Sequence, residues 1–290
     1  MCARQEKLAS IVPKGSELER LYTGFQFTEG PLWNASERFL LFSDIPANRI
    51  YRWSPDERVE VFRDPSGNSN GLTYDKQGCL LICEHGNRRL SRIDKEGTYT
   101  VLADAFQGKP LNSPNDVVVK SDGTVYFTDP TYGIEPHEQE LPFQGVYRLD
   151  PEGRKLILLV DDFIRPNGLA FSPDETVLYI GDSSIDKRHV RAFDVDPDGT
   201  LSNSRVFAEI LSELPGNPDG MKVDIDGSLY VSAAGGIWVF SEDGEHLGTI
   251  RTPEIPANCA WGGEDWKTLF ITARTSIYRL KTNVAGVKVP

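Results

Sequence analysis

The stretch Asn217-Pro218-Asp219-Gly220-Met221 holds a pattern that recurs along the chain: a polar residue, a turn-forming residue, and then an apolar strand. The pattern occurs at six sites, which are Glu29-Gly30, Asn70-Gly71, Asn115-Asp116, Asn167-Gly168, Asp219-Gly220 and Asn258-Cys259. Neighbouring sites are 41, 45, 52, 52 and 39 residues apart. A period of about 40–50 residues is typical of four-stranded propeller blades. The sequence therefore predicts six blades.

Short runs of β-branched and aromatic residues fill each repeat. In the third repeat, Val117–Val119 is followed by the turn Ser121-Asp122-Gly123 and then by Val125–Phe127. Such runs, broken by Asp-Gly or Pro-Asp, indicate hairpins. No segment sustains a long helical period, although Phe207–Leu214 is a candidate for one short helix. The predicted fold class is all-β, a six-bladed β-propeller.

A short strand-like segment, Leu18–Tyr22, precedes the first repeat. Its pairing with the last blade would close the ring and remove an exposed sheet edge. Residues 1–16 are polar and without a period, so we expect an N-terminal arm, mobile or covering an edge, followed by one propeller domain over residues 17–290. An acidic insertion, Ile134–Gln144, follows the second strand of blade three, and its role is left open.

Composition excludes several classes of function. The 290-residue chain has a net charge of -12, and it offers no basic stripe for a nucleic acid. It has no apolar run of about eighteen residues, and Met1–Lys14 lacks the apolar core of a signal peptide. We therefore expect a soluble cytoplasmic protein without a nucleic-acid or membrane partner. Its oligomeric state is left open.

The six residues that open the repeats all offer an oxygen atom. Because the first strand of each blade lines the channel of a propeller, these side chains should converge near its axis. Turn preference alone is an alternative explanation for Asn and Asp before Gly, and for Asn70 or Asn258 it is equally good. Glu29 is not a favoured turn residue. A carboxylate buried in the channel requires a counter-charge, which a divalent cation would provide.

The charge and donor types of this ring indicate which cation. Glu29 and Asp219 would balance a 2+ ion, and Asn115 and Asn167 would add neutral carbonyl oxygens. An all-oxygen shell is typical of Ca²⁺, and no His or Cys occupies these positions to favour zinc. We expect one divalent ion, Ca²⁺ first, with Mg²⁺, Mn²⁺ or Zn²⁺ as alternatives.

The motifs around these residues resemble a known family. EGPLW at Glu29, SPNDV at Asn115, RPNGLAF at Asn167 and NPDGM at Asp219 are similar to motifs of the gluconolactonase, regucalcin and senescence-marker-protein family. The resemblance covers Phe25–Leu280, and SDIP, CEHGNRR, FTDPTYG and LPFQGVYRLDP make it closest to bacterial gluconolactonases. The related diisopropylfluorophosphatases have a similar four-oxygen metal site on this fold.

This resemblance implies an enzyme that opens a sugar lactone such as gluconolactone, with one metal held by Glu29, Asn115, Asn167 and Asp219. The metal would polarise the ring carbonyl, and Asp219 would act as the base that activates water, while Glu29 would be a structural anionic ligand. Candidate substrate-binding residues come from the channel ring and from the loops after the second strands. They are Asn70, Glu84, His85, Asp129, Tyr132, Asn258 and Arg274. Ser113 replaces a basic substrate-contacting residue of the animal branch.

Two alternatives to a lactonase stay open from the sequence: a metal-dependent phosphotriesterase-like hydrolase and a non-catalytic binding propeller. A different motif, Gly67-Asn68-Ser69-Asn70-Gly71, matches the G-x-S-x-G nucleophile elbow of α/β-hydrolases. That elbow requires a strand before the serine and a helix after it. Leu72–Gly78 instead indicates a strand and a hairpin, which argues against a Ser69 nucleophile.

Overall fold

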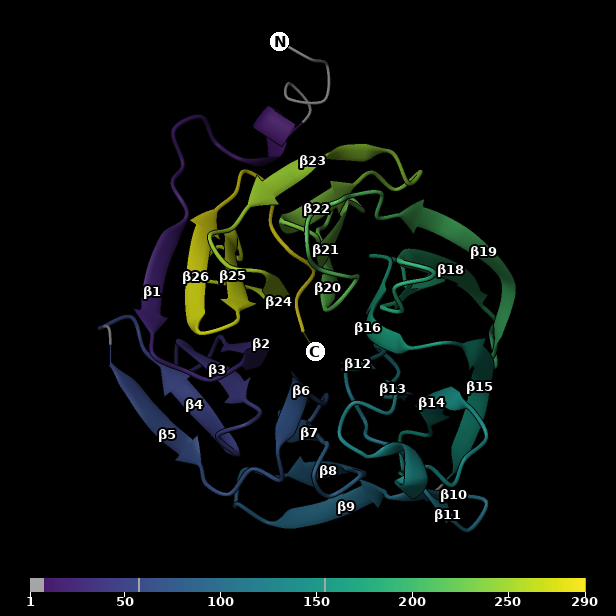
Figure 1. The fold of residues 1–290 in the computed structure, drawn as a ribbon. Coiled ribbons are helices and arrows are strands. Elements are labelled where there is room, and N and C mark those ends of the chain that lie inside the picture. The colour runs from purple at the N-terminus through teal and green to yellow at the C-terminus, as the bar shows by residue number, and fades with distance from the viewer. Residues whose placement is uncertain (1–7, 57, 154, 290) are drawn as a thin grey trace.

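Residues 8–56, 58–153 and 155–289 are described by the structure, a computed structural model. Six four-stranded antiparallel sheets are arranged as blades around a central channel (Figure 1). Blades one to three are β2 (Thr28–Asn34), β3 (Phe39–Asp44), β4 (Arg49–Trp53) and β5 (Val59–Arg63); β6 (Ser69–Tyr74), β7 (Leu80–Glu84), β8 (Arg89–Ile93) and β9 (Tyr99–Ala103); and β12 (Val117–Val119), β13 (Val125–Asp129), β14 (Gln144–Leu149) and β15 (Leu156–Phe163). Blades four to six are β16 (Pro166–Phe171), β17 (Val177–Asp182), β18 (His189–Val195) and β19 (Leu201–Glu209); β20 (Met221–Val223), β21 (Leu229–Ala233), β22 (Gly236–Phe240) and β23 (His246–Arg251); and β24 (Pro256–Gly262), β25 (Thr268–Ala273), β26 (Ser276–Lys281) and β1 (Glu19–Thr23). The predicted six-bladed propeller is confirmed.

The position of a strand within its blade decides its composition. Second strands are buried along their whole length, as in β3 with the sequence FLLFSD and β7 with LLICE. They read as continuous apolar runs because neighbouring blades pack against both of their faces. The fourth strands lie at the rim and are less buried, as in β5, where three of the five residues of VEVFR are exposed. Polar residues on these strands suit a face in contact with water.

Blade six combines the two ends of the chain. β1 pairs antiparallel with β26, and Glu19 bonds the Arg279 guanidinium at 2.6 Å. This pairing closes the ring as predicted from Leu18–Tyr22. Of the predicted arm, residues 1–7 lie outside the described residues, but Ile11 is buried and its carbonyl accepts a 2.7 Å hydrogen bond from the Asn283 amide. This part of the arm therefore covers an edge.

The C-terminal segment lies at the centre of the ring (Figure 1). The Val287 amide donates to the Val223 carbonyl at 3.0 Å, and Gly286 packs so closely that a Cβ there would lie 1.7 Å from the Trp261 ring. A cavity of about 130 Å³ remains between this segment and the inner strands. The segment thus fills the channel end at which the first strands finish.

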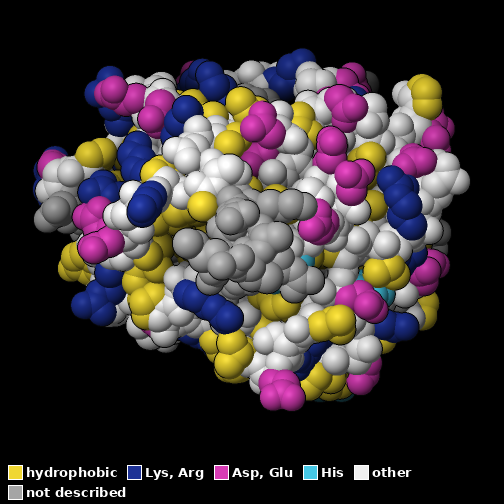
Figure 2. Space-filling view, turned by 90° about the horizontal axis from the view of Figure 1, so that it is seen from above, with side chains coloured by type: hydrophobic (Ala, Val, Ile, Leu, Met, Phe, Trp, Pro, Cys, Tyr) yellow, Lys and Arg dark blue, Asp and Glu magenta, His cyan; other side chains and the backbone are white. Residues whose placement is uncertain are grey.

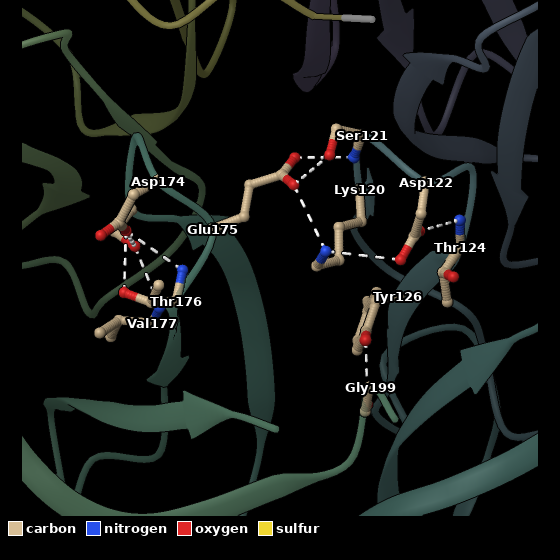
Figure 3. Close-up of polar contacts among 11 residues, drawn as sticks. Lys120, Ser121, Asp122, Thr124, Tyr126, Asp174, Glu175, Thr176, Val177 and Gly199 are labelled. Carbon is tan, nitrogen blue, oxygen red and sulfur yellow. Dashed lines mark hydrogen bonds and ion pairs between the residues drawn. The ribbon is translucent and has the colours of Figure 1, made fainter. Parts of the chain in front are cut away.

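Polar contacts join blades three and four at that same end (Figure 3). Glu175, in the turn between β16 and β17, accepts a 2.7 Å hydrogen bond from the Ser121 amide and lies 3.5 Å from Lys120 Nζ. The Tyr126 hydroxyl donates to the Gly199 carbonyl at 2.9 Å. These contacts hold the hairpin turns of two neighbouring blades together.

One element was predicted wrongly. The segment Phe207–Leu214 forms no helix: Phe207 lies within β19, and irregular chain follows that strand. The alternating sequence of β19 pairs with β18, and pairing overrides the weak helical pattern. The insertion 134–144 holds one short 3₁₀ helix, Pro136–Glu138. No helix in the described part of the chain is long and apolar enough to cross a membrane.

Candidate functional site

The repeat-opening residues lie where each first strand begins at the channel. Glu29 is in β2 and Asn167 in β16, whereas Asn115 and Asp219 come just before β12 and β20. The pairing register shifts right after Glu29 and around Asn167, which marks bulges in the inner strands. A bulge changes the direction in which a side chain points without ending the strand. The sequence pattern therefore marks bulges at Glu29 and Asn167, whereas Asn115 and Asp219 lie in irregular chain before their strands.

Close approach of neighbouring blades explains the glycines in this pattern. A Cβ at Gly30 would lie 2.0 Å from the Asn70 carbonyl oxygen, and one at Gly220 would lie 1.9 Å from Cγ of Asn258. Any side chain at these positions would separate the inner strands. The glycines thus permit the ring of polar residues to be narrow.

Hydrogen bonds link these side chains in sequence around the channel. Asn70 Nδ2 donates to Asn115 Oδ1 at 2.8 Å, and Asn115 Nδ2 donates to Asn167 Oδ1 at 2.8 Å. On the other side, Asn258 Nδ2 donates to Glu29 Oε2 at 3.0 Å. All four asparagines and Glu29 are buried. The predicted metal ligands thus lie together on one ring.

Two carboxylates of this ring are in contact. Burial raises the pKa of Asp219 well above its usual value, and the charge of Glu29 raises it further. Burial also raises the pKa of Glu29, as does the charge of Asp116, the residue after Asn115. Neither Glu29 nor Asp219 has an ion pair with a described Lys, Arg or His side chain. The geometry therefore holds a buried acid, Glu29, and a partly buried acid, Asp219, without a counter-charge from the described residues.

The donor set fits a divalent metal ion. No group of three or more His, Cys, Asp and Glu side chains that could hold a metal occurs among the described residues. An ion at the ring would therefore need the amide oxygens of Asn115 and Asn167 in addition to Glu29 and Asp219. Hard cations such as Ca²⁺ accept mixed carboxylate and amide oxygens. The uncompensated pair of acids is the observation that favours such an ion.

Above the ring lies an open cavity of about 470 Å³. Its lining comprises Phe27, Glu29, Ile45, Pro46, Asn70, His85, Asn115, Tyr132, Asn167, Ser183, Pro215, Gly216, Asn217, Asp219, Ile255, Pro256, Ala257 and Arg274. Of the substrate-binding candidates, this lining includes Asn70, His85, Tyr132 and Arg274. Glu84, Asp129 and Asn258 are not part of it.

Glu84 and Asp129 are engaged inside their own blades. Glu84 accepts hydrogen bonds from Ser91, Tyr99 and Arg89, the last at 3.0 Å. Asp129 accepts a 2.8 Å bond from the Asn112 amide. These acids terminate second strands, and their side chains hold adjoining segments in place instead of facing the cavity.

The same role recurs at equivalent positions of other blades. Asp44 accepts 3.0 Å bonds from the Gln26 and Phe27 amides, and Asp182 accepts bonds from the amides of Ile164 and Arg165. An acid at this repeat position accepts hydrogen bonds from the loop that precedes the first strand of its blade, and so holds that loop in place. The loop residues after the acid, among them His85 and Ser183, are the ones that line the cavity.

Asn258 and Ser113 hold residues of the site in place without lining the cavity. Asn258 lies beneath the cavity and fixes Glu29 through the 3.0 Å bond. Ser113 is fully buried: its hydroxyl donates to the Pro130 carbonyl at 2.6 Å and accepts from the Gly133 amide at 2.9 Å. Ser113 thus shapes the loop that carries Tyr132.

Two polar residues of the cavity wall, His85 and Tyr132, are uncharged near neutral pH. Burial lowers the pKa of His85 to about 4, and its Nε2 lies 3.3 Å from Asn115 Oδ1. Burial, followed by the charge of Asp219, raises the pKa of Tyr132 to about 12. The Tyr132 hydroxyl contacts the Ser183 hydroxyl and lies 3.3 Å from Asn167 Nδ2. These groups can bind the hydroxyls of a polar ligand.

Sequence reasoning missed the remaining lining residues. Ser183 has a signal that would have found it, because it directly follows a second strand just as His85 does. Pro215–Asn217 and Ile255 precede first strands, whereas Pro256 and Ala257 open β24, and their sequences hold no distinguishing mark. Phe27, Ile45 and Pro46 add apolar surface, which only the assembled ring reveals.

Ser69 lies in β6 and is fully buried, with its hydroxyl 2.9 Å from that of Ser43. A strand and not a helix follows it, so the nucleophile elbow is absent at this motif. The rejection of a Ser69 nucleophile is consistent with this geometry.

Comparison with known proteins places the site in a family context. The family model described as SMP-30/Gluconolactonase/LRE-like region matches residues 27–275. The gluconolactonase of Zymomonas mobilis is 37% identical over 305 residues, covering 97% of this chain and 85% of that one. Regucalcin of Xenopus laevis is 27% identical over 86% of this chain and 83% of its own.

Solved structures agree with these sequence relatives. A gluconolactonase of Xanthomonas campestris superposes with a TM-score of 0.88 at 38% identity, covering 95% of this chain and 92% of that one. A calcium-binding regucalcin of Agrobacterium tumefaciens gives a TM-score of 0.81 at 20% identity, over 95% and 97% of the two chains. At that identity, the second likeness shows the fold alone.

Proposed function

Because the chain belongs to the SMP-30/gluconolactonase/LRE-like family, we propose that it is a hydrolase that opens sugar lactones with the help of a divalent metal ion. The observation that carries this proposal is the contact between Glu29 and Asp219 at the floor of an open cavity. Two acids in contact without a counter-charge destabilise a protein unless a cation joins them. A non-catalytic propeller would have no use for this arrangement.

Glu29, Asn115, Asn167 and Asp219 would hold the ion, with Ca²⁺ as the first candidate. Mg²⁺, Mn²⁺ and Zn²⁺ are the alternatives. When bound, the ion would polarise the lactone carbonyl and neutralise the two acids. The relatives named regucalcin, one of them described as calcium-binding, support a divalent ion of this kind.

The two acids differ in how they are held. Glu29 Oε2 accepts from the Gly30 amide at 2.6 Å and from Asn258 at 3.0 Å, so its orientation is fixed. Among the described residues, the Asn167 side chain is the hydrogen-bond donor that stabilises the charge of Asp219. We therefore assign Asp219 as the general base that takes a proton from the attacking water, and Glu29 as a structural ligand.

The uncharged polar side chains of the cavity wall suit a substrate that is rich in hydroxyl groups. Tyr132 and Ser183 form one hydroxyl pair, and His85 and Asn70 form a second polar group across the ring. Relatives are named for the lactones of both six-carbon and five-carbon sugar acids, a gluconolactonase and a pentonolactonase. We propose that sugar lactones are the substrates of this chain and that it acts on small molecules.

The test combines metal analysis with a lactone panel. Purified protein should contain about one divalent ion per chain, and it should hydrolyse D-glucono-1,5-lactone well above the spontaneous rate. Asp219→Asn should lower kcat by about 10²–10⁴, the usual contribution of a general base. Failure to hydrolyse any lactone in the presence of Ca²⁺, Mg²⁺, Mn²⁺ or Zn²⁺ would overturn the proposal. Paraoxon in the same panel tests for a phosphotriesterase.

A further inference from the structure

Two arginines stand at the edge of the cavity, each against an aromatic residue of its lining. The Arg274 guanidinium lies 5.1 Å from the centroid of Phe27, and that of Arg165 lies 5.1 Å from the centroid of Tyr132. Arg274 belongs to blade six and itself lines the cavity, whereas Arg165 enters blade four. Blades four and six lie on different sides of the central channel (Figure 1).

Neither arginine has an ion-pair partner among the described residues. Nine other described arginines form salt bridges with Asp or Glu, and Arg274 is the one among the remaining described arginines that lines the cavity. Glu254, an acid close to Arg274 in the fold, is occupied by other groups: the Thr275 amide and hydroxyl at 2.8 Å and the Tyr278 hydroxyl at 2.7 Å. The chain has a net charge of -12, yet Arg274 lines the cavity without an acidic partner among the described residues.

The rest of the cavity adds little fixed charge. His85 contributes an imidazole whose Nε2 lies 3.3 Å from Asn115 Oδ1. The remaining lining consists of amides, hydroxyls and apolar side chains, apart from Glu29 and Asp219 at the floor. A divalent ion there would balance these two acids. Arg274 would then be the uncompensated charge of the lining. The rim of the molecule, by comparison, intersperses acidic and basic side chains (Figure 2).

We propose that the preferred substrates are sugar lactones that carry a second, anionic group, a carboxylate or a phosphate, which Arg274 binds at the cavity edge. This inference rests on the lactonase proposed above and specifies its substrate class. A guanidinium presents a planar fork that matches both anions. Its stacking on Phe27 keeps that fork in place before the ligand arrives. Arg165 adds attraction for the same charge from another side.

Three lactones test the proposal with the metal-loaded, full-length protein. D-glucono-1,4-lactone is neutral, D-glucaro-1,4-lactone carries a carboxylate at C6, and the 6-phosphate of gluconolactone carries a phosphate. We expect kcat/KM for at least one charged lactone to exceed that for the neutral one by about tenfold or more, as one charged hydrogen bond provides. Raising the salt concentration should reduce this preference.

Variants assign the preference to the arginine. Arg274→Gln should raise KM for the charged lactone by about tenfold, and it should raise KM for the neutral lactone by much less. Arg274→Lys keeps the charge and should lose less. Arg63→Gln is the matched control, because Arg63 also lies 5.1 Å from an aromatic centroid, that of Tyr99, but on the outer strand β5 away from the cavity. It should change neither reaction.

The outcomes separate this inference from the lactonase itself. If the neutral lactone is hydrolysed as well as both charged ones, or if Arg274→Gln impairs all three equally, the inference is wrong and the lactonase stands. If no lactone is hydrolysed with any of the metals, both are wrong. A preference for phosphate over carboxylate, or the reverse, identifies which anion the cavity binds.

Discussion

Asp219→Asn should make the metal-free protein more stable while it impairs catalysis. In the absence of a cation, Asp219 and Glu29 are in contact, and burial, followed by the charge of Glu29, raises the pKa of Asp219. Two unit charges about 4 Å apart repel by about 4 kcal/mol at an effective dielectric constant of about 20. Uptake of a proton relieves part of this repulsion, so we expect the variant to gain about 1–3 kcal/mol.

Thermal unfolding in excess chelator measures this gain. For a domain of this size, 1–3 kcal/mol corresponds to a rise in Tm of about 2–6 °C. With Ca²⁺ added, the order should reverse, because the wild type binds the ion with two carboxylates and the variant with one. Asn167→Asp is the matched control: it adds a third acid to the same ring and should lower the Tm of the metal-free protein. If Asp219→Asn were less stable than the wild type in chelator, the counter-charge argument would be refuted.

Three further substitutions distinguish a residue that lines the cavity from residues that stabilise the fold. Tyr132→Phe removes a hydroxyl from the cavity wall, so KM for a sugar lactone should rise about tenfold with Tm nearly unchanged. Glu84→Gln should do the reverse, lowering stability by about 2–4 kcal/mol in chemical denaturation with KM unchanged, because it removes the buried charge that pairs with Arg89 and leaves one acceptor oxygen where the carboxylate has two. Glu175→Ala removes the clamp between blades three and four, and it should cost about 1 kcal/mol without affecting activity, since Glu175 lies at the far end of the channel.

The repeat spacing sufficed to predict the fold. Six polar residues in register predicted six blades, and the spare segment at Leu18–Tyr22 predicted the closing strand. Both inferences need only local patterns and the rule that a sheet edge must be covered. The candidate metal ligands could be named for the same reason, because residues at one repeat position meet at the axis of a propeller.

The mistakes arose where local sequence is ambiguous. An acid at the end of a second strand can face the cavity or brace a loop, and the sequence of Glu84 or Asp129 does not distinguish the two. Asn before Gly has the composition of a turn, yet at Asn70 the glycine is needed because Gly71 packs against Asn115 and Asp116 of the next blade. Such contacts between blades depend on the assembled ring.

The prediction of a helix over residues 207–214 was wrong for a related reason. Its apolar residues fit a short helix as well as an edge strand, and only the pairing of β19 with β18 decides between them. Ser183 was missed although its position after Asp182 matches that of His85 after Glu84. Comparing the loops at equivalent positions, in addition to the strand openings, would have found it.

Exhaustive chelation of the purified protein, followed by metal analysis and a lactone hydrolysis assay, tests the central proposal most directly. The pair of acids Glu29 and Asp219 lies at the floor of an open cavity, so a chelator should reach the ion. We expect metal-free protein to lose nearly all lactone hydrolysis above the spontaneous rate, and stoichiometric Ca²⁺ to restore it. Full activity in protein that analysis shows to be free of metal would contradict the proposal that a divalent ion at this ring performs the chemistry.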